Sequence, residues 1–343
     1  MVAGGLPTVG DGGGLQRRRR VLCAGAALAL AGAGMRAAAA PSYPSRVVRL
    51  VVPQAVGGSN DLLARLVADH LEPLLGVAVV VDNRAGASGA IGCEAVARAA
   101  PDGYTLLAAS SNTHAMAPHV VERLPYDPLR DFAPIVNLAS TVKLLLVAAA
   151  LPPRTLGEFV AYARARPGEL NYASAGVGSS QHLDTELFKG IARVDLVHVP
   201  YRGSIQGLVA LRTGEVQVAL NSVGAALPYL RGGEVRALAV FGGSRSPLLP
   251  DVPTASEAGL DGLDRVDLRT WTGLAAPAGT RAEVVDRLNR DANRVLAQPA
   301  VADWLRSRGL EPIGGTAEAF ARQMRTDYEA WARLVRQIGL RAG

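Results

Sequence analysis

The sequence predicts an α/β protein whose two domains enclose a ligand crevice, and two observations carry this prediction. Apolar runs of strand length alternate with amphipathic runs of helix length almost throughout the 343 residues, which is the pattern of parallel sheets covered by helices. The middle of the chain also forms a series of its own, with an extended crossing on either side. Such a chain returns to its first domain at the end, and ligands usually lie in the crevice between the domains.

The amino terminus, residues 1–39, is expected to be a secretory signal peptide. Four consecutive arginines, residues 17–20, precede the apolar run 21–35, and the alanines at 37–40 supply an Ala-x-Ala cleavage site. The apolar run is too short to span a bilayer. Residues 18–22 also fit a twin-arginine pattern, so the general and the twin-arginine export routes both stay open. We therefore expect the mature protein to be exported.

The charge and cysteine content of the mature chain bear on nucleic-acid binding and on disulfides. Cleavage after Ala39 leaves 304 residues and removes five arginines and one aspartate, so the net charge falls from +6 to +2. The basic balance of the full chain is therefore no sign of nucleic-acid binding. Cys93 is the one cysteine that remains. A hydrophobic core must hold the fold, because no disulfide can form within the mature chain.

The first predicted strand leads into a glycine loop that favours an anion. Residues 47–52 are apolar and mostly β-branched at every position but Arg49, and the run stops at Pro53, as expected for a strand buried on both faces. Gly57 and Gly58 follow, and then a helical pattern begins. The first amides of such a helix lack partners and favour negative charge, and the glycines let a ligand approach them. The alternative is an ordinary strand-to-helix turn.

Residues near the helix ends predict where the helices begin and stop. Ser59 or Asn60 is placed to cap the helix after the glycine loop, and Pro73 should end or kink it. The spacing of residues 155–158 and of residues 280–283 is that of a capping box. The second box would open a helix to residue 297, and two further helices, from residues 300 and 316, would close the chain.

The remaining strands divide the chain into domains. The first domain is predicted to comprise residues 40–141 and, after the return crossing, residues 265–343, while residues 142–264 form the second domain. In the first domain we expect strands at 77–81, 105–109, 135–138 and, as one long extended run, 266–276. In the second domain we expect strands at 143–148, 170–173, 196–199, 216–220 and 235–240.

Common catalytic and cofactor motifs are missing from the mature sequence. Neither of its two lysines, Lys143 and Lys189, stands in a P-loop, and no serine stands in a Gly-x-Ser-x-Gly elbow. The histidines lack metal-ligand spacing with cysteines or carboxylates. Residues 176–181 begin like a dinucleotide fingerprint but lack its third glycine. These observations argue against an enzyme, a metal centre and a bound cofactor.

Small polar residues recur where predicted strands pass into helices. Residues 110–113, 174–180 and 201–204 are such joints, in addition to the glycine loop. Hydroxyls, amides and free backbone N–H groups satisfy a carboxylate at moderate cost, so a site of this kind can release its ligand. Each joint alone would be only a helix cap. Together they favour a crevice lined for an oxyanion.

Ordered motifs along the whole chain after residue 42 resemble one family, the extracytoplasmic solute-binding proteins of tripartite tricarboxylate transporters, known as the Bug or TctC family. The resemblance begins with Tyr43-Pro44-Ser45 and the loop from Pro53 to Asp61. The other motifs lie at residues 81–86, 100–106, 124–128, 170–174, 198–204, 249–254 and 276–280.

The resemblance implies a two-domain periplasmic binding protein that closes on a small carboxylated solute and delivers it to the membrane permease subunits of the transporter. It implies no cofactor, no metal, no catalysis and no nucleic-acid partner. The ligand contacts that the family positions imply are Gln54, Gly57, Gly58, Ser59, Asn60, Asp61, Ser110, Asn112, Thr113, Ser174, Ala175, Gly176, Ser179, Tyr201, Arg202 and Asn221.

Two departures from the family pattern concern the ligand. The family commonly has an aromatic residue at the position of Gln54 and an aspartate at that of Asn221, and a neutral Asn221 would permit a dicarboxylate or an uncharged tail. His182 could reach the ligand or make a structural hydrogen bond. Two alternatives to transport stay open at this point: a periplasmic sensor subunit that presents bound ligand to a membrane kinase, and a secreted enzyme that uses the same crevice.

Overall fold

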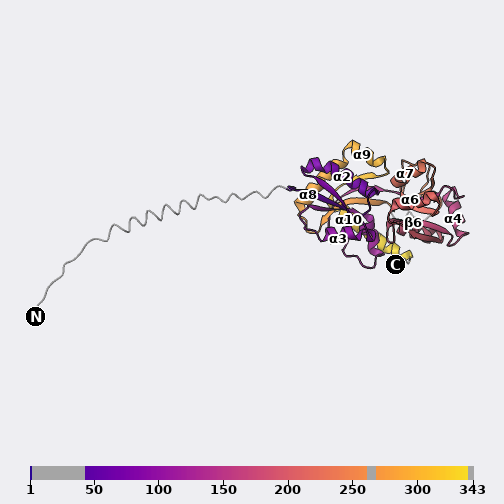
Figure 1. The fold of residues 1–343 in the computed structure, drawn as a ribbon, viewed down its shortest axis with the longest axis horizontal. Helices are drawn as coiled ribbons and strands as arrows, with labels where there is room; N and C mark the ends of the chain where they lie inside the picture. The colour runs from indigo at the N-terminus through magenta and orange to yellow at the C-terminus, as the bar shows by residue number, and fades with distance from the viewer. Residues whose placement is uncertain (2–42, 261–267, 339–343) are drawn as a thin grey trace. The chain divides into compact units, whose positions relative to one another are not determined.

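Two β-sheets organise the chain, and each has helices on both of its faces (Figure 1). The computed structural model describes residue 1, residues 43–260 and residues 268–338. The expected signal peptide, apart from Met1, lies outside the described residues. None of the helices in this part of the chain combines the length and the apolar character that a membrane crossing requires.

The first sheet has six strands in the order β11-β4-β10-β3-β1-β2. Strands β1, β2 and β3 are parallel, whereas β10 runs antiparallel to β3 and β4, and β11 runs antiparallel to β4. The expectation of parallel sheets is therefore wrong in part, because the chain leaves this sheet through β4 and returns through β10. The strands are β1 (Val48–Val52), β2 (Val79–Asn83), β3 (Thr105–Ser110), β4 (Phe132–Thr141), β10 (Thr270–Pro277) and β11 (Glu311–Gly314).

Strand β1 is buried on both faces, as its β-branched sequence predicts. Leu50 packs in one hydrophobic cluster with α2 and α8, and Val51 packs in another with α3 and α10; both side chains have no exposed surface. Figure 1 shows α2, α8 and α9 grouped with this sheet. Its helices are α2 (Ser59–Leu75), α3 (Ala90–Ala97), α8 (Ala282–Leu296), α9 (Pro299–Arg306) and α10 (Ala317–Ile338), with short turns η1 (Ala87–Gly89), η2 (Asn112–Met116) and η3 (Ala117–His119).

The second sheet has five strands in the order β7-β6-β8-β5-β9. Strand β6 is parallel to β7 and β8, and β5 is antiparallel to β8 and β9. Helices α4 and α5 cover one face, while α6 and α7 cover the other. The elements are β5 (Lys143–Ala148), α4 (Leu156–Arg164), β6 (Leu170–Ser174), α5 (Ser180–Ala192), β7 (Leu196–Pro200), α6 (Ser204–Thr213), β8 (Val218–Ser222), α7 (Val223–Arg231) and β9 (Val235–Phe241).

Helix α2 begins and ends differently from the prediction. Its N-cap is Gly58, with no side-chain cap bond, so neither Ser59 nor Asn60 caps it. The helix continues past Pro73 to Leu75. It stops because Gly76 adopts the left-handed conformation, with φ 72°, and its N–H bonds back to the carbonyl of Glu72.

One of the two expected capping boxes forms in part, because the Glu158 carboxylate accepts from the N–H of Arg154, one residue before the N-cap. The Thr155 side chain accepts a hydrogen bond from the N–H of Glu158 at the start of α4. At the start of α8, by contrast, Arg281 occupies the N-cap without a side-chain bond. The Thr280 hydroxyl donates instead to the carbonyl of Pro277, 2.8 Å away, so this prediction is wrong.

We call the six-stranded sheet and its helices the first lobe, and the five-stranded sheet and its helices the second lobe. Val142 alone separates β4 from β5, and residues 242–269 connect β9 back to β10. Helix α10 contributes Phe320 to the core of the first lobe and Trp331 to that of the second. The domain boundaries at 141/142 and 264/265 stay a prediction, and the start of the extended run at residue 266 lies outside the described residues.

Candidate functional site

A cavity of about 700 Å³ lies between the two lobes. The first lobe contributes the loop after β1, the η1 turn and the residues after β3. The second lobe contributes the loop after β6, the loop before α6 and the end of β8. The first residues of α2, α5 and α6, which are Ser59, Ser180 and Ser204, all line it. Helix starts carry partial positive charge, so the cavity favours an anion.

Most of the sequence-predicted ligand residues line this cavity. Five do not, namely Gly57, Asp61, Thr113, Ser174 and Tyr201. Those that do are Gln54, Gly58, Ser59, Asn60, Ser110, Asn112, Ala175, Gly176, Ser179, Arg202 and Asn221.

Asp61 shapes the glycine loop from below. It is 1% exposed, and its carboxylate accepts hydrogen bonds from the Gly57 N–H at 2.9 Å, from Asn83 at 2.8 Å and from Arg65 at 3.1 Å. Burial alone would raise the pKa of this carboxyl, but the donors of Arg65, Gly57 and Asn83 outweigh burial and lower it. Asp61 is therefore charged at neutral pH and fully engaged with protein groups.

Ser174 and Tyr201 also make internal contacts in place of lining the cavity. The Ser174 hydroxyl lies 2.6 Å from Nε2 of His198 and accepts from the Gly176 N–H at 3.0 Å. The Tyr201 hydroxyl donates to Glu215 at 2.8 Å. The bond between Gly176 and Ser174 holds backbone next to the cavity, because Gly176 itself lines it.

Thr113 is buried beneath the end of β3. Its hydroxyl donates to the carbonyl of Ser110 at 3.1 Å and lies 2.8 Å from Nδ1 of His114. Burial lowers the pKa of His114 to about 4, so the ring is neutral at pH 7. These contacts fix the position of Ser110, which faces the cavity.

Three polar atoms of the cavity region have no hydrogen-bond partner among the described residues. They are Oε1 of Gln54, Oγ of Ser111 and Oδ1 of Asn112, all buried. Nearly all buried polar atoms in native proteins have a hydrogen-bond partner, either a protein group or a bound molecule. A polar solute or water in the cavity would therefore supply hydrogen-bond partners to these three atoms.

The charged groups that line the cavity are cations. Lys143 and Arg202 are among the described lining residues, and these include no aspartate or glutamate. The Lys143 ammonium is already paired with the buried carboxylate of Asp184, so the attraction on a negatively charged solute comes mainly from Arg202, and no lining carboxylate repels it.

Comparisons with known proteins agree with this geometry. Residues 63–340 match the family model described as "Tripartite tricarboxylate transporter family receptor", TctC. The chain is 35% identical to "Protein BugT" of Bordetella pertussis over 312 residues, covering 90% of this chain and 95% of BugT. This chain belongs to the TctC, or Bug, family. It is therefore a solute-binding protein and not an enzyme.

Solved structures confirm the fold of this TctC-family chain. "R. palustris Rpa4515 with adipate" matches with a TM-score of 0.84 and 37% identity, over 88% of this chain and 100% of that one. "MatC (Rpa3494) from Rhodopseudomonas palustris with bound malate" matches with a TM-score of 0.81 and 35% identity, over 85% and 100%. The predicted periplasmic binding protein fold, with a cleft between domains, is confirmed.

Several cavity residues of the TctC-family chain escaped the sequence analysis. Lys143 and Thr141 come from the short crossing between the lobes, and Thr272 comes from the return strand. Ser88 of η1 donates to the carbonyl of Val177, 2.5 Å away, across the cavity. A lysine at the start of an apolar strand was a usable signal for Lys143, whereas nothing in the sequence places Thr272 beside the cavity.

His182 makes the structural contact that was its alternative role. Its Nδ1 accepts a hydrogen bond from the N–H of Gly178 at 3.2 Å, and it is absent from the described cavity lining. The ring stacks on His198 with centroids 4.3 Å apart. The two histidines thus support the loop at residues 174–179 from beneath.

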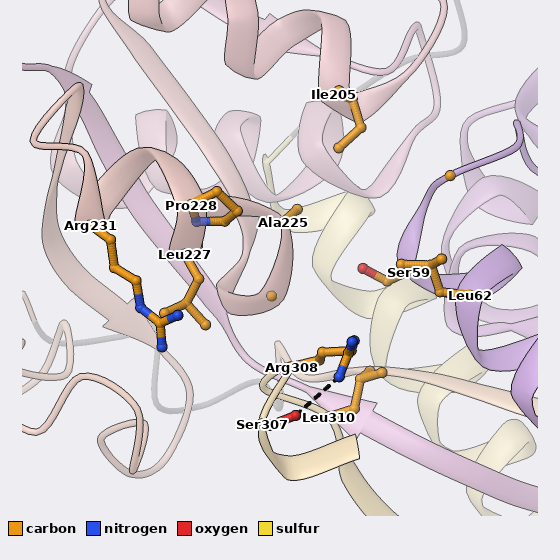
Figure 2. A pocket seen from close by; sticks show the side chains of 12 residues that line it. Ser59, Leu62, Ile205, Ala225, Leu227, Pro228, Arg231, Ser307, Arg308 and Leu310 are labelled. Carbon is orange, nitrogen blue, oxygen red and sulfur yellow. Dashed lines mark hydrogen bonds between the residues drawn. The ribbon is translucent and has the colours of Figure 1, made fainter. Parts of the chain in front are cut away.

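A second cavity, of about 450 Å³, continues the cleft on the side of α7 (Figure 2). It shares Ser59, Ile205 and Leu310 with the main cavity. Figure 2 shows Arg231 on α7 on one side and Arg308, bonded to Ser307, at the lower edge. The space between the lobes therefore extends beyond the main cavity.

Proposed function

We propose that this chain captures a small carboxylate in the cavity between its lobes and delivers it to the membrane permease of a tripartite tricarboxylate transporter. The observation that carries the proposal is the lining of the cavity: three helix starts, many hydroxyls and amides, and two cations, with no carboxylate among the described lining residues. The adipate and malate named with two similar structures are carboxylates as well.

The chemistry of the lining also suits delivery, because a transport receptor has to release what it binds. Neutral hydrogen bonds contribute about 0.5–1.5 kcal/mol each to a complex, less than bonds between charged groups. A cavity that holds a carboxylate mainly with hydroxyls, amides and backbone N–H groups can therefore bind it and give it up again. We propose the eleven predicted residues that line the cavity as its ligand contacts.

The sequence of the amino terminus supports the same role. A receptor for an extracytoplasmic solute has to leave the cytoplasm, and the arginine-rich start, the apolar run and the alanine-rich cleavage site of residues 1–39 are the features of a signal peptide. We propose that the mature chain begins near residue 40 and acts in the periplasm.

Thermal unfolding with a panel of organic acids tests the proposal. A ligand that binds only the folded chain stabilises it by RT ln(1 + [L]/Kd), about 2.7 kcal/mol at a hundredfold excess over Kd. One or more acids should therefore raise the melting temperature by several degrees, roughly 2–4 °C per kcal/mol for a chain of this size. The fully methylated ester of each active acid, which has no carboxylate left, is the control and should have no effect.

Mass spectrometry of the denatured, freshly purified protein gives an independent reading. A co-purified acid that is recovered unchanged after long incubation with the protein would support capture and delivery. The proposal fails when no acid in the panel stabilises the protein and none co-purifies.

A further inference from the structure

The second cavity, of about 450 Å³, is bounded by both lobes (Figure 2). The first lobe contributes Leu62 at the start of α2 and Arg308 in the turn after α9. The second lobe contributes Arg231 of α7 and Ile205 of α6. Of these four residues only Ile205 also lines the main cavity. Most of this wall therefore takes no part in the site proposed for the solute.

The charged residues in the described lining of this second cavity are two arginines, Arg231 and Arg308, and no aspartate or glutamate accompanies them there. Both arginines are exposed. Arg231, in the last turn of α7, makes no hydrogen bond or ion pair with the described residues. A concave surface lined by charges of one sign concentrates the field and attracts the opposite charge. The second cavity therefore favours an acidic group.

Arg308 is oriented for such a contact. Its guanidinium lies over the Trp304 ring, 3.9 Å from the ring centre, and Nη1 donates to the Ser307 hydroxyl at 3.1 Å and to the Trp304 carbonyl at 3.4 Å. Nε and Nη2 have no partner among the described residues. Stacking on an aromatic ring fixes a guanidinium, and two of its N–H groups side by side match the two oxygens of a carboxylate.

The rest of the lining is largely apolar, and part of it is open to solvent. Leu62 and Ile205, one from each lobe, are 41% and 40% exposed. Small solutes are usually enclosed by their sites, whereas here the two arginines and both of these apolar side chains are exposed. Exposed apolar side chains together with arginine are typical of protein–protein interfaces. The composition therefore favours a protein segment over a second small solute.

The two lobes meet beside this cavity through their backbones. A Cβ at Gly224, at the start of α7, would overlap the carbonyl oxygen of Arg308, and a Cβ at Gly309 would lie 2.9 Å from Cβ of Val223. Without side chains at the two glycines, the turn after α9 packs directly on α7. The separation of Arg231 and Arg308 thus depends on how the lobes are placed. A group that binds both arginines selects one arrangement of the lobes.

We propose that the second cavity is the surface on which the membrane permease docks, through an acidic segment that pairs with Arg231 and Arg308 and packs an apolar side chain against Leu62. This inference rests on the proposed function and adds the place of contact. The segment touches both lobes, and so does a solute in the main cavity. The two binding events are therefore coupled, and each strengthens the other.

Binding of the purified permease subunits in lipid nanodiscs, measured by biolayer interferometry, tests the inference. Arg231→Gln combined with Arg308→Gln keeps polar side chains and removes both charges. This double variant should bind the permease at least about tenfold more weakly than wild type, a difference of about 1.4 kcal/mol, and should change its calorimetric affinity for the stabilising acid less than about threefold. Wild-type binding to the permease should weaken with added salt and strengthen at least about threefold when the acid is bound.

Two further variants separate the contact from a general effect of charge. Arg154→Gln combined with Arg290→Gln is the matched control, because it removes one exposed arginine from each lobe, outside the described lining of both cavities. It should leave permease binding unchanged. Leu62→Ser tests the apolar part of the contact at an exposed position and should weaken permease binding at least about threefold. Melting temperatures check that each variant is folded.

The inference is overturned when the variant of Arg231 and Arg308 binds the permease as tightly as wild type, when the control variant loses as much, or when affinity for the acid falls in parallel. A wild-type dimer that dissociates in this variant would assign the cavity to a second copy of the chain, and a small anion that co-purifies only with wild type would assign it to a solute; both contradict the inference. A wild-type protein that binds the acid but no permease contradicts delivery in the proposed function, whereas permease binding that is independent of the two arginines contradicts this inference alone.

Discussion

The hydroxyls of Ser59 and Ser222 lie 3.3 Å apart and join the start of α2 in the first lobe to the end of β8 in the second. The hydrogen bond from Ser88 to the carbonyl of Val177 is another link between the lobes. Each neutral bond contributes only about 0.5–1.5 kcal/mol. The lobes are thus held together at the cavity by weak contacts, which suits a cleft that opens and closes around a solute.

The first prediction tests the serine pair. Ser59→Ala and Ser222→Ala should each weaken binding of the stabilising acid about two- to tenfold, the range of one neutral hydrogen bond. The double variant should lose little more affinity than the weaker-binding of the two single variants, because both changes remove the same contact. Calorimetry on the four proteins gives the coupling energy. Ser256→Ala, at a serine outside the described cavity lining, is the control, and fully additive losses would show that the serines act separately.

A second prediction separates the two glycines of the loop before α2. A side chain at Gly58 would meet only the Ala55 carbonyl, at 3.6 Å, and its φ of −73° suits any residue. Gly58→Val should therefore keep the melting temperature while abolishing binding, since Gly58 lines the cavity. Gly57 has φ 85°, so Gly57→Ala should instead lower the free energy of unfolding by about 1–2 kcal/mol. Thermal unfolding and calorimetric titration distinguish the two variants. If Gly58→Val still binds the acid, Gly58 serves only the turn and not the ligand.

The same loop shows how far the sequence could predict the site. Strand β1 and its glycine loop follow directly from an apolar run that stops at a proline. The direction of each side chain does not follow, because Asp61 and Ser59 are two residues apart in one helical turn. One turns back to bond the Gly57 N–H, and the other faces the cavity. Only the packed structure distinguishes these two orientations.

Some strands of the fold could not be predicted from the sequence. Strand β11, Glu311–Gly314, has no apolar alternation and includes Pro312, so nothing in its sequence predicts a strand; its backbone pairs with β4. The sequence also does not predict the directions of β4 and β10, because an apolar strand has the same residue pattern in parallel and antiparallel sheets. The partnership of Lys143 with Asp184 spans 41 residues and becomes visible only when α5 packs on β5.

A third prediction concerns Asn221, which lines the cavity and also makes hydrogen bonds within the protein. It donates from Nδ2 to the Ser204 carbonyl at 3.2 Å and accepts at Oδ1 from the Ser222 N–H at 2.9 Å. In Asn221→Asp the donor to Ser204 is lost and a negative charge enters the cavity. We expect a lower melting temperature without ligand, and an affinity loss of at least about tenfold.

Salt separates the two effects of this substitution. Added salt should reduce the loss of affinity, because it screens repulsion between the new carboxylate and the solute. It should not restore the lost donor. Titrations at low and high ionic strength, with Asn171→Asp on the adjacent strand β6 as the control, measure this. Equal affinities of wild type and Asn221→Asp would exclude Asn221 as a ligand contact.

The last prediction is acid sensitivity through His182 and His198. Burial, together with the charge of the neighbouring His182, lowers the pKa of His198 to about 4, and burial lowers the pKa of His182 too. Glu186 opposes these shifts, and Lys189 reinforces them. An unfolded histidine has a pKa near 6.5, so the unfolded chain takes up protons first as the pH falls. The stabilising effect of the neutral rings is therefore complete above pH 6.5 and is lost progressively between pH 6.5 and 4.

Binding should weaken in the same window, because protonated His182 can no longer accept from the Gly178 N–H and the loop at 174–179 loses that support. Between pH 7 and 5 we expect His198 to account for a loss of about 1 kcal/mol in unfolding free energy, after allowance for solvent screening. Urea unfolding of wild type and His198→Asn at both pH values isolates this share from those of His114 and His119, whose pKa values are lowered as well. His70→Gln, on α2 with its ring against the Leu66 carbonyl, is the control. If wild type and His198→Asn lose the same unfolding free energy between pH 7 and 5, the acid sensitivity does not come from His198, because the variant lacks that ring.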